Sequence, residues 1–213
     1  MKILNLYACL GGNRYKWNEV KDDIEVTAVE LDSELARLYQ ERFPNDKVIV
    51  ADAHQYLLDY FDDFDFVWSS PPCPTHSRLN SMIIKNTGKV RYPDMKLYKE
   101  ILVLQKWFKG KFVVENVIPY YEPLIRGIKR DRHIYWTNFN LPNDLGDRKK
   151  IDLTKLSVKD LEEFHKINLS DYRGKQDKGK IGRNLVDYEE GKTIFETMLG
   201  IVQQDNTQQN KLF

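Results

Sequence analysis

The sequence has few cysteines, no excess of either charge and no long apolar run, and each shortage excludes a class of protein. Cys9 and Cys73 are the only cysteines, too few for a disulfide-stapled secreted scaffold, so a reducing, cytoplasmic location is expected. The 33 Lys and Arg against 32 Asp and Glu leave a net charge of +1, which excludes a uniformly basic nucleic-acid coat protein and leaves only local basic patches for such contacts. The apolar start MKILNLYACLGG is shorter than the roughly 20 residues of a membrane span and fits a buried strand, so no targeting segment and no membrane partner are expected.

Short apolar runs alternate along the chain with stretches of helical periodicity. The expected strands cover residues 3–7, 24–29, 48–50, 64–68, 111–114 and 133–136. The expected helices cover residues 33–43, 96–108, 157–167 and 188–202, the first two with Ser33 and Asp94 as N-caps. The 213 residues fit a single domain. The alternation predicts an α/β fold, a doubly wound Rossmann-like sheet whose ligands bind beyond the carboxyl ends of the strands.

Residues typical of a nucleoside site follow the first three expected strands. The first strand ends in LYACLGG, residues 6–12, where two glycines permit a tight turn and close approach of the backbone to a ligand. Glu30 ends the second strand, near the offset at which an acid meets ribose hydroxyls, and Asp52 follows the third, where it suits an adenine amino group. A plain turn and solvated carboxylates are the alternative for each part alone. Two acids at successive strand ends, behind a glycine turn, together favour an adenosyl cofactor. The absence of GxGxxG and of the Walker pattern makes a nicotinamide or a triphosphate less favoured.

The fourth expected strand leads into SSPPCPTHS, residues 69–77, which presents a cysteine after two prolines. The prolines fix the backbone φ and stiffen the turn, so that Cys73 is held rigidly over a cleft. Methyl transfer to C5 of cytosine needs a soft nucleophile that adds at C6, and a thiol is the most nucleophilic side chain near neutral pH. The alternatives are a small buried hydrophobe, or a zinc site with His76 that lacks a second nearby pair of ligands.

Charged residues follow the later strands. Glu115, after the fifth strand, is a candidate acid that holds or protonates cytosine N3 and so eases addition at C6. Arg130 and Arg132 precede the sixth expected strand, where they could bind O2 of the base or a phosphate, with a solvated basic turn as the alternative. The predicted catalytic residues are therefore Cys73, Glu115, Arg130 and Arg132.

The segments LYACLGG, VELD, AD, SSPPCPTHS, VVENV, KRDR and GRNLVDYEEGKTI, in this order, resemble the DNA (cytosine-5) methyltransferase family over nearly the whole chain. SPPC with Ser77 four residues on, and ENV at the next strand, are the most specific. The resemblance implies S-adenosylmethionine as donor, a flipped cytosine in duplex DNA as substrate, Cys73 as nucleophile, Glu115 at N3, and both arginines at the flipped base. It implies these cofactor-binding residues: Tyr7, Ala8, Cys9, Leu10, Gly11, Gly12, Glu30, Leu31, Asp52, Ala53, Pro72, Asn184 and Val186.

The sequence departs from the family pattern in places. Pro74 and Ile128 each stand where the family usually has Gln, which indicates a divergent branch. Residues 139–181 are too few for the separate target-recognition domain that the family usually inserts. A short or relaxed recognition site, or an additional specificity subunit, is therefore expected. An RNA cytosine methyltransferase and a non-catalytic DNA-binding relative are the alternative functions.

The polar tail, residues 203–213, is expected to be flexible and ends in QNKLF. It resembles the QxxLF pentapeptide by which bacterial replication proteins dock on the sliding clamp, here through Gln209, Leu212 and Phe213. The alternative is that Leu212 and Phe213 pack onto the last helix as a terminal anchor.

Overall fold

A central seven-stranded sheet organises the chain in the computed structural model, which describes residues 1–89, 91–146, 148 and 151–202. The strands follow the order β3-β2-β1-β4-β5-β7-β6. Strands β3, β2, β1, β4 and β5 are parallel, whereas β7 is antiparallel to both β5 and β6. The strands are β1 Lys2–Leu6, β2 Glu25–Glu30, β3 Lys47–Val50, β4 Phe66–Ser69, β5 Lys111–Val117, β6 Ile128–Arg130 and β7 His133–Thr137. This arrangement confirms the predicted α/β fold.

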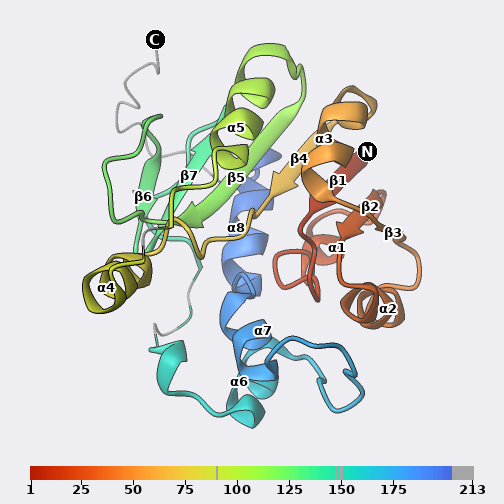
Figure 1. Ribbon diagram of the computed structural model, residues 1–213. Coiled ribbons are helices and arrows are strands. Elements are labelled where there is room, and N and C mark those ends of the chain that lie inside the picture. Colours follow the sequence, from red (N-terminus) through yellow and green to blue (C-terminus); the bar gives the residue numbers. More distant parts are fainter. Residues whose placement is uncertain (90, 147, 149–150, 203–213) are drawn as a thin grey trace.

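Helices cover both faces of the sheet (Figure 1). Alternate residues of each strand enter opposite cores because strand side chains alternate in direction. Leu4 and Val67 pack with α3 and α5, whereas Ile3 and Phe66 pack with α1 and α8. The helices are α1 Trp17–Val20, α2 Ser33–Arg42, α3 Ala53–Tyr60, α4 Arg78–Thr87, α5 Lys96–Trp107, α6 Val158–His165, α7 Lys178–Asn184 and α8 Tyr188–Met198, with 3₁₀ turns at Phe61–Asp63 and Leu153–Lys155.

The predicted strands all occur, but two N-caps were wrong. Asp32, not Ser33, caps α2, because the chain leaves β2 at Glu30 and Ser33 is already helical; the Asp32 carboxylate accepts from the amides of the first turn. Helix α5 begins after Met95, which makes no side-chain cap, and Asp94 accepts from the amide of the first helical residue. Strand β6 and helices α1, α3, α4 and α7 were not predicted, since each is short or lacks a long apolar stripe.

The described residues of the region 139–181 pack against the body of the sheet domain. Leu169 and Tyr172 share an apolar cluster with Leu10 and Leu35, from the turn after β1 and from α2. The Tyr172 hydroxyl also donates to the Asp32 carboxylate at 2.8 Å. The insertion therefore supports the edge of the sheet at which ligands are expected.

Gln209, Leu212 and Phe213, named above as clamp-docking residues, lie outside the described residues. Within the described ranges, no helix has the length and apolar character needed to cross a membrane.

Candidate active site

The turn after β1 is built from backbone conformations that few residues adopt. Tyr7, Cys9 and Gly11 have φ of 55°, 47° and 65°, in the left-handed region. A Cβ added at Gly12 would lie 2.3 Å from the carbonyl oxygen of Val186, so only glycine allows this approach. The structure thus packs the glycine turn directly against the late segment before α8, which contains Val186.

Glu30 ties this turn to α2. Its carboxylate accepts from the amide of Cys9 at 2.8 Å and from the amide of Asp32 at 2.9 Å. Burial raises the pKa of Glu30, and the backbone hydrogen bonds oppose that rise. The next side chain, Leu31, is 71% exposed and forms an apolar surface beside the carboxylate. The end of β2 therefore presents a fixed acid next to a free apolar face.

The other predicted cofactor residues lie at neighbouring strand and helix ends. Asp52 caps α3 by accepting from the amide of Gln55 at 3.1 Å, and its second oxygen lies 3.3 Å from Nζ of Lys96. These contacts, the backbone hydrogen bond first, lower the pKa of Asp52. Ala53 is buried behind it, and Asn184 is exposed at the end of α7.

Hydrogen bonds from β4 and from its neighbour β5 hold the loop that carries Cys73. The Asn116 side-chain amide donates to the carbonyl of Pro71 at 2.9 Å, and Nε1 of Trp68 donates to Oγ of Ser70 at 2.9 Å. The carbonyl of Cys73 accepts from the amides of residues 76 and 77, both at 2.9 Å. Cys73 therefore follows β4 on a loop that hydrogen bonds hold in place, next to Pro72.

The Glu115 carboxyl acts electrostatically on Cys73. Burial, and then the nearby Glu115 carboxyl, raise the pKa of Cys73, while Lys180 and Arg132 oppose the rise. Glu115 is 7% exposed, and burial raises its pKa to about 7 against the opposing effects of Ser70 and Arg132. Near neutral pH the Glu115 carboxyl is therefore available as a proton donor.

The two predicted arginines are used differently. The guanidinium of Arg130 donates to the backbone carbonyls of Pro142 at 2.6 Å, Leu141 at 3.0 Å and Lys129 at 3.0 Å, which fixes it to the start of the insertion. Arg132 is exposed in the turn between β6 and β7, and its charge acts on Cys73 and Glu115. The structure thus brings Arg132 into the site and engages Arg130 elsewhere.

Glu100 is a buried acid that the sequence analysis missed. It is 0% exposed on α5 and accepts from the Tyr7 hydroxyl at 2.6 Å and the Ser69 hydroxyl at 2.7 Å, with Nδ1 of His54 at 2.8 Å. It therefore links the glycine turn to the residue before the cysteine loop. The signal was present, because Glu100 lies at helical spacing within the apolar stripe of α5, next to Ile101.

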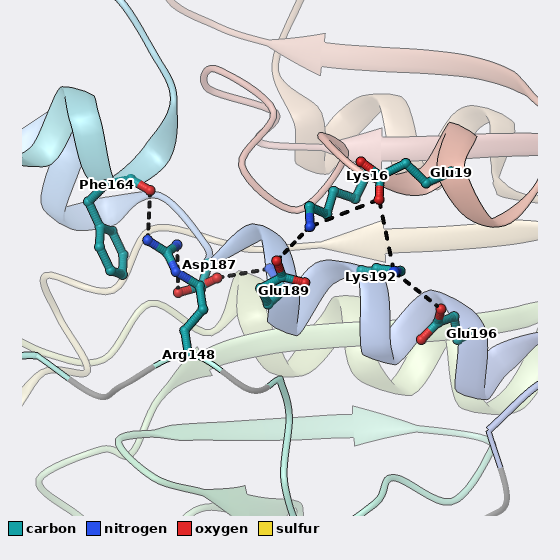
Figure 2. Close-up of polar contacts among 8 residues, drawn as sticks. All are labelled: Lys16, Glu19, Arg148, Phe164, Asp187, Glu189, Lys192 and Glu196. Carbon is teal, nitrogen blue, oxygen red and sulfur yellow. Dashed lines mark hydrogen bonds and ion pairs between the residues drawn. The ribbon is translucent and has the colours of Figure 1, made fainter.

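A cavity of about 180 Å³ lies between the β6–β7 turn, the insertion and α8, with Arg132 and Glu190 in its lining. On its insertion side Arg148 donates to Asp187 at 3.1 Å and to the carbonyl of Phe164 at 2.9 Å, as Figure 2 shows. The Arg148 guanidinium also lies 3.5 Å from the centroid of the Phe164 ring. These contacts attach the insertion to the first turn of α8.

The sheet order, with β7 antiparallel between β5 and β6, is that of the S-adenosylmethionine-dependent methyltransferase fold. Residues 1–118, more than half of the chain, match the family described as C-5 cytosine-specific DNA methylase. The chain belongs to that family.

The chain is similar to several solved structures. The Entamoeba histolytica methyltransferase EhMeth aligns with 10% identity and a TM-score of 0.52, over 96% of this chain and 99% of that one. Spodoptera frugiperda DNMT2 aligns with 18% identity and a TM-score of 0.43, over 76% and 64% of the two chains. A protein of Escherichia coli described as a prophage DNA modification methyltransferase aligns with 16% identity and a TM-score of 0.42, over 76% and 54%. The matched region spans less than two thirds of the last two proteins. No curated protein matches the sequence.

Proposed function

We propose that this protein transfers a methyl group from S-adenosylmethionine to C5 of a cytosine in DNA, with Cys73 as a covalent nucleophile. The observation that carries the proposal is that two adjacent parallel strands carry a thiol and a carboxyl, both of raised pKa, close enough for Glu115 to raise the pKa of Cys73. Cys73 follows β4 and Glu115 lies in β5, and Asn116 ties the two segments together. This pairing suits addition to a ring that must be protonated as it is attacked.

The residues around the glycine turn suit an adenosyl donor. The left-handed turn shapes the backbone after β1, and the missing Cβ at Gly12 lets this turn pack closely against Val186, the late residue assigned to the same pocket. The Glu30 oxygens have lone pairs left for ribose hydroxyls, and exposed Leu31 offers an apolar face to a purine. Asp52 lies at the end of β3, where an exocyclic amino group would reach it. When bound, S-adenosylmethionine supplies the methyl group.

The residues of this chain have defined parts in the reaction. The Cys73 thiolate forms a bond to C6 of the cytosine while the Glu115 carboxyl gives its proton to N3, so the ring gains electron density at C5. Arg132 supplies positive charge beside the ring and favours the thiolate. Once C5 carries the methyl group, loss of the C5 proton to water expels the thiolate, and N3 returns its proton to Glu115. Because Arg130 is held by three carbonyls, we assign it to anchoring the insertion next to this site.

The insertion is the proposed source of target contacts. The 213 residues act as one methyltransferase domain in this proposal, and residues 139–181 pack on it rather than forming a domain of their own. A surface of this size contacts few bases, so we propose a short recognition site. A longer recognition site would require an additional specificity subunit.

One experiment tests the substrate and the reaction together. The purified protein is given S-adenosylmethionine with a labelled methyl group, and matched duplex DNA and RNA, followed by sequencing of methylated cytosines in the product. The proposal predicts label at C5 of cytosine in DNA. Label in RNA alone would replace DNA as the substrate, and label in neither would refute the proposed function.

A further inference from the structure

A second set of ionisable groups extends from Glu115 away from Cys73. In the antiparallel pairing of β5 and β7, Glu115 lies opposite Tyr135 and two residues from the position opposite His133. Side chains at these positions point to the same face of the sheet. That face is covered by α8, whose Phe195 packs in the same cluster as Tyr135. Glu115, His133 and Tyr135 therefore lie beneath α8.

Glu190 of α8 completes the set. Nε2 of His133 lies 3.5 Å from Oε1 of Glu115, and Nδ1 of the same ring lies 3.8 Å from Oε2 of Glu190. The Tyr135 hydroxyl faces Glu190 at 3.4 Å. Both imidazole gaps exceed the length of a hydrogen bond by less than about 1 Å, which a small side-chain rotation closes. A single imidazole thus lies between two carboxyls from different elements.

The two carboxyls differ in access to solvent. The Glu115 side chain is 9% exposed, whereas that of Glu190 is 19% exposed and lines the cavity beside the insertion. Glu190 can therefore exchange a proton with water more readily than Glu115 can.

We propose that His133 and Glu190 are positioning residues that keep Glu115 protonated, so that it can give its proton to cytosine N3. This inference rests on the proposed function. Glu190 acts on Glu115 through the tautomer of the His133 imidazole. An ionised Glu190 accepts from Nδ1–H of His133, which leaves Nε2 as an acceptor facing Glu115. An acceptor at that place favours the protonated form of Glu115.

The electrostatic surroundings support this assignment. Burial lowers the pKa of His133, so the ring is neutral near pH 7 and has one donor and one acceptor nitrogen. Burial raises the pKa of Glu190 to about 7, as it does for Glu115, so one proton can pass between carboxyls of similar acidity.

Other charged and titratable groups face Glu115 and Glu190 from the neighbouring elements. Around Glu115 these are Cys73 and Ser70 from the loop after β4, Arg132 from the β6–β7 turn, and Tyr135 from β7. Around Glu190 they are His133, Asp187, Glu115 and Arg132, with Tyr135. The positive charge of Arg132 opposes protonation of both carboxyls. In the proposed arrangement the acceptor nitrogen of His133 acts against this effect at Glu115.

The pH profile of kcat/KM measures this effect. The reactive form has Cys73 as thiolate and Glu115 protonated, and burial raises the pKa of Cys73 from its ordinary value. With the Glu115 pKa at about 7, this form increases with pH up to the Glu115 pKa and is then level until the Cys73 pKa is reached. The height of the level part falls tenfold for each unit by which the Glu115 pKa falls.

The test compares Glu190→Gln and His133→Phe with the control Glu189→Gln. The control removes a carboxylate from the same helix turn, one that pairs with Lys16 at 2.6 Å, as Figure 2 shows. We expect Glu190→Gln and His133→Phe to move the break in the profile about one pH unit lower and to lower its level part about tenfold, since a neighbouring charge or hydrogen bond commonly shifts a pKa by that much. The control leaves both features where they are in the wild type.

A second measurement does not depend on turnover. The full chain, labelled with ¹³C at glutamate side-chain carboxyls, is titrated by NMR, and the Glu115 resonance is assigned with Glu115→Gln. We expect its midpoint to move to lower pH in Glu190→Gln and to stay in the control. An active wild type with an unmoved midpoint and an unmoved profile in Glu190→Gln overturns this inference alone. A wild type that methylates neither DNA nor RNA overturns the proposed function, and with it the role given to these residues.

Discussion

Replacing Glu100 with alanine tests how strongly the fold depends on one buried carboxylate. The side chain is 0% exposed and has three partners within 2.6–2.8 Å, contributed by Tyr7, Ser69 and His54. The variant leaves these polar groups without their acceptor, and each buried unsatisfied group costs about 1–3 kcal/mol. Tyr7 is half-buried and regains water, so the sum falls short of the maximum. We expect a loss of about 3–5 kcal/mol in the free energy of unfolding, the range found when a buried charged network is broken.

The assay is equilibrium urea unfolding followed by tryptophan fluorescence, with Lys99→Ala as the matched control. Lys99 is exposed on the same helix, so its replacement should change the free energy of unfolding by less than about 0.5 kcal/mol. A Glu100→Ala variant that loses less than about 1 kcal/mol would show that the three hydrogen bonds do not hold the glycine turn and the cysteine loop together in solution.

Three further predictions follow from the site and its surroundings. Glu30→Ala should weaken S-adenosylmethionine binding by about 1.5–3 kcal/mol, the value of a hydrogen bond to a charged group, and calorimetry that finds an unchanged Kd would reduce Glu30 to a structural strut. Burial, and then Arg148, lower the pKa of His165 to about 3, below its unfolded value near 6.5. The unfolded chain therefore binds a proton first on acidification, and stability should fall by up to about 1.4 kcal/mol per pH unit below about pH 6.5; His165→Phe should lose less, and parallel curves for both proteins would contradict this. Methylated sites mapped in DNA from expressing cells should share a short consensus, whereas a long, strict one found without a partner protein would show that the insertion reads more bases than its size allows.

The sequence predicted the sheet and the positions of the proposed reacting residues for the same physical reason. Buried parallel strands need continuous apolar runs, which can be recognised in the amino-acid sequence. The carboxyl ends of such strands meet at one edge of the sheet. Cys73 and Glu115 could therefore be placed together before any coordinates, as could Gly12 and Glu30. The structure places all four at that edge.

Long-range packing decided what the sequence could not predict. Arg130 is engaged by carbonyls at residues 141 and 142, which depends on how the insertion folds back. The bridge between Glu115 and Glu190 depends on the register of β5 with β7 and on the placement of α8. Local periodicity contains none of this information. Glu100 is different, since an acid within an apolar helical stripe is itself a readable sign of a buried polar network.

The most direct test of the central claim is to trap the bond between Cys73 and cytosine. Fluorine at C5 takes the place of the proton that must leave, so the thiolate cannot be expelled after methyl transfer. The protein is incubated with S-adenosylmethionine and DNA containing 5-fluorocytosine, and the masses of the products are measured by mass spectrometry. The Cys73→Ala variant is the control. The proposal predicts a stable protein–DNA adduct, mapped to Cys73 and absent from the variant, together with loss of methyl transfer to ordinary cytosine in the variant. Methyl transfer by Cys73→Ala at the wild-type rate, or an adduct on another residue, would contradict it.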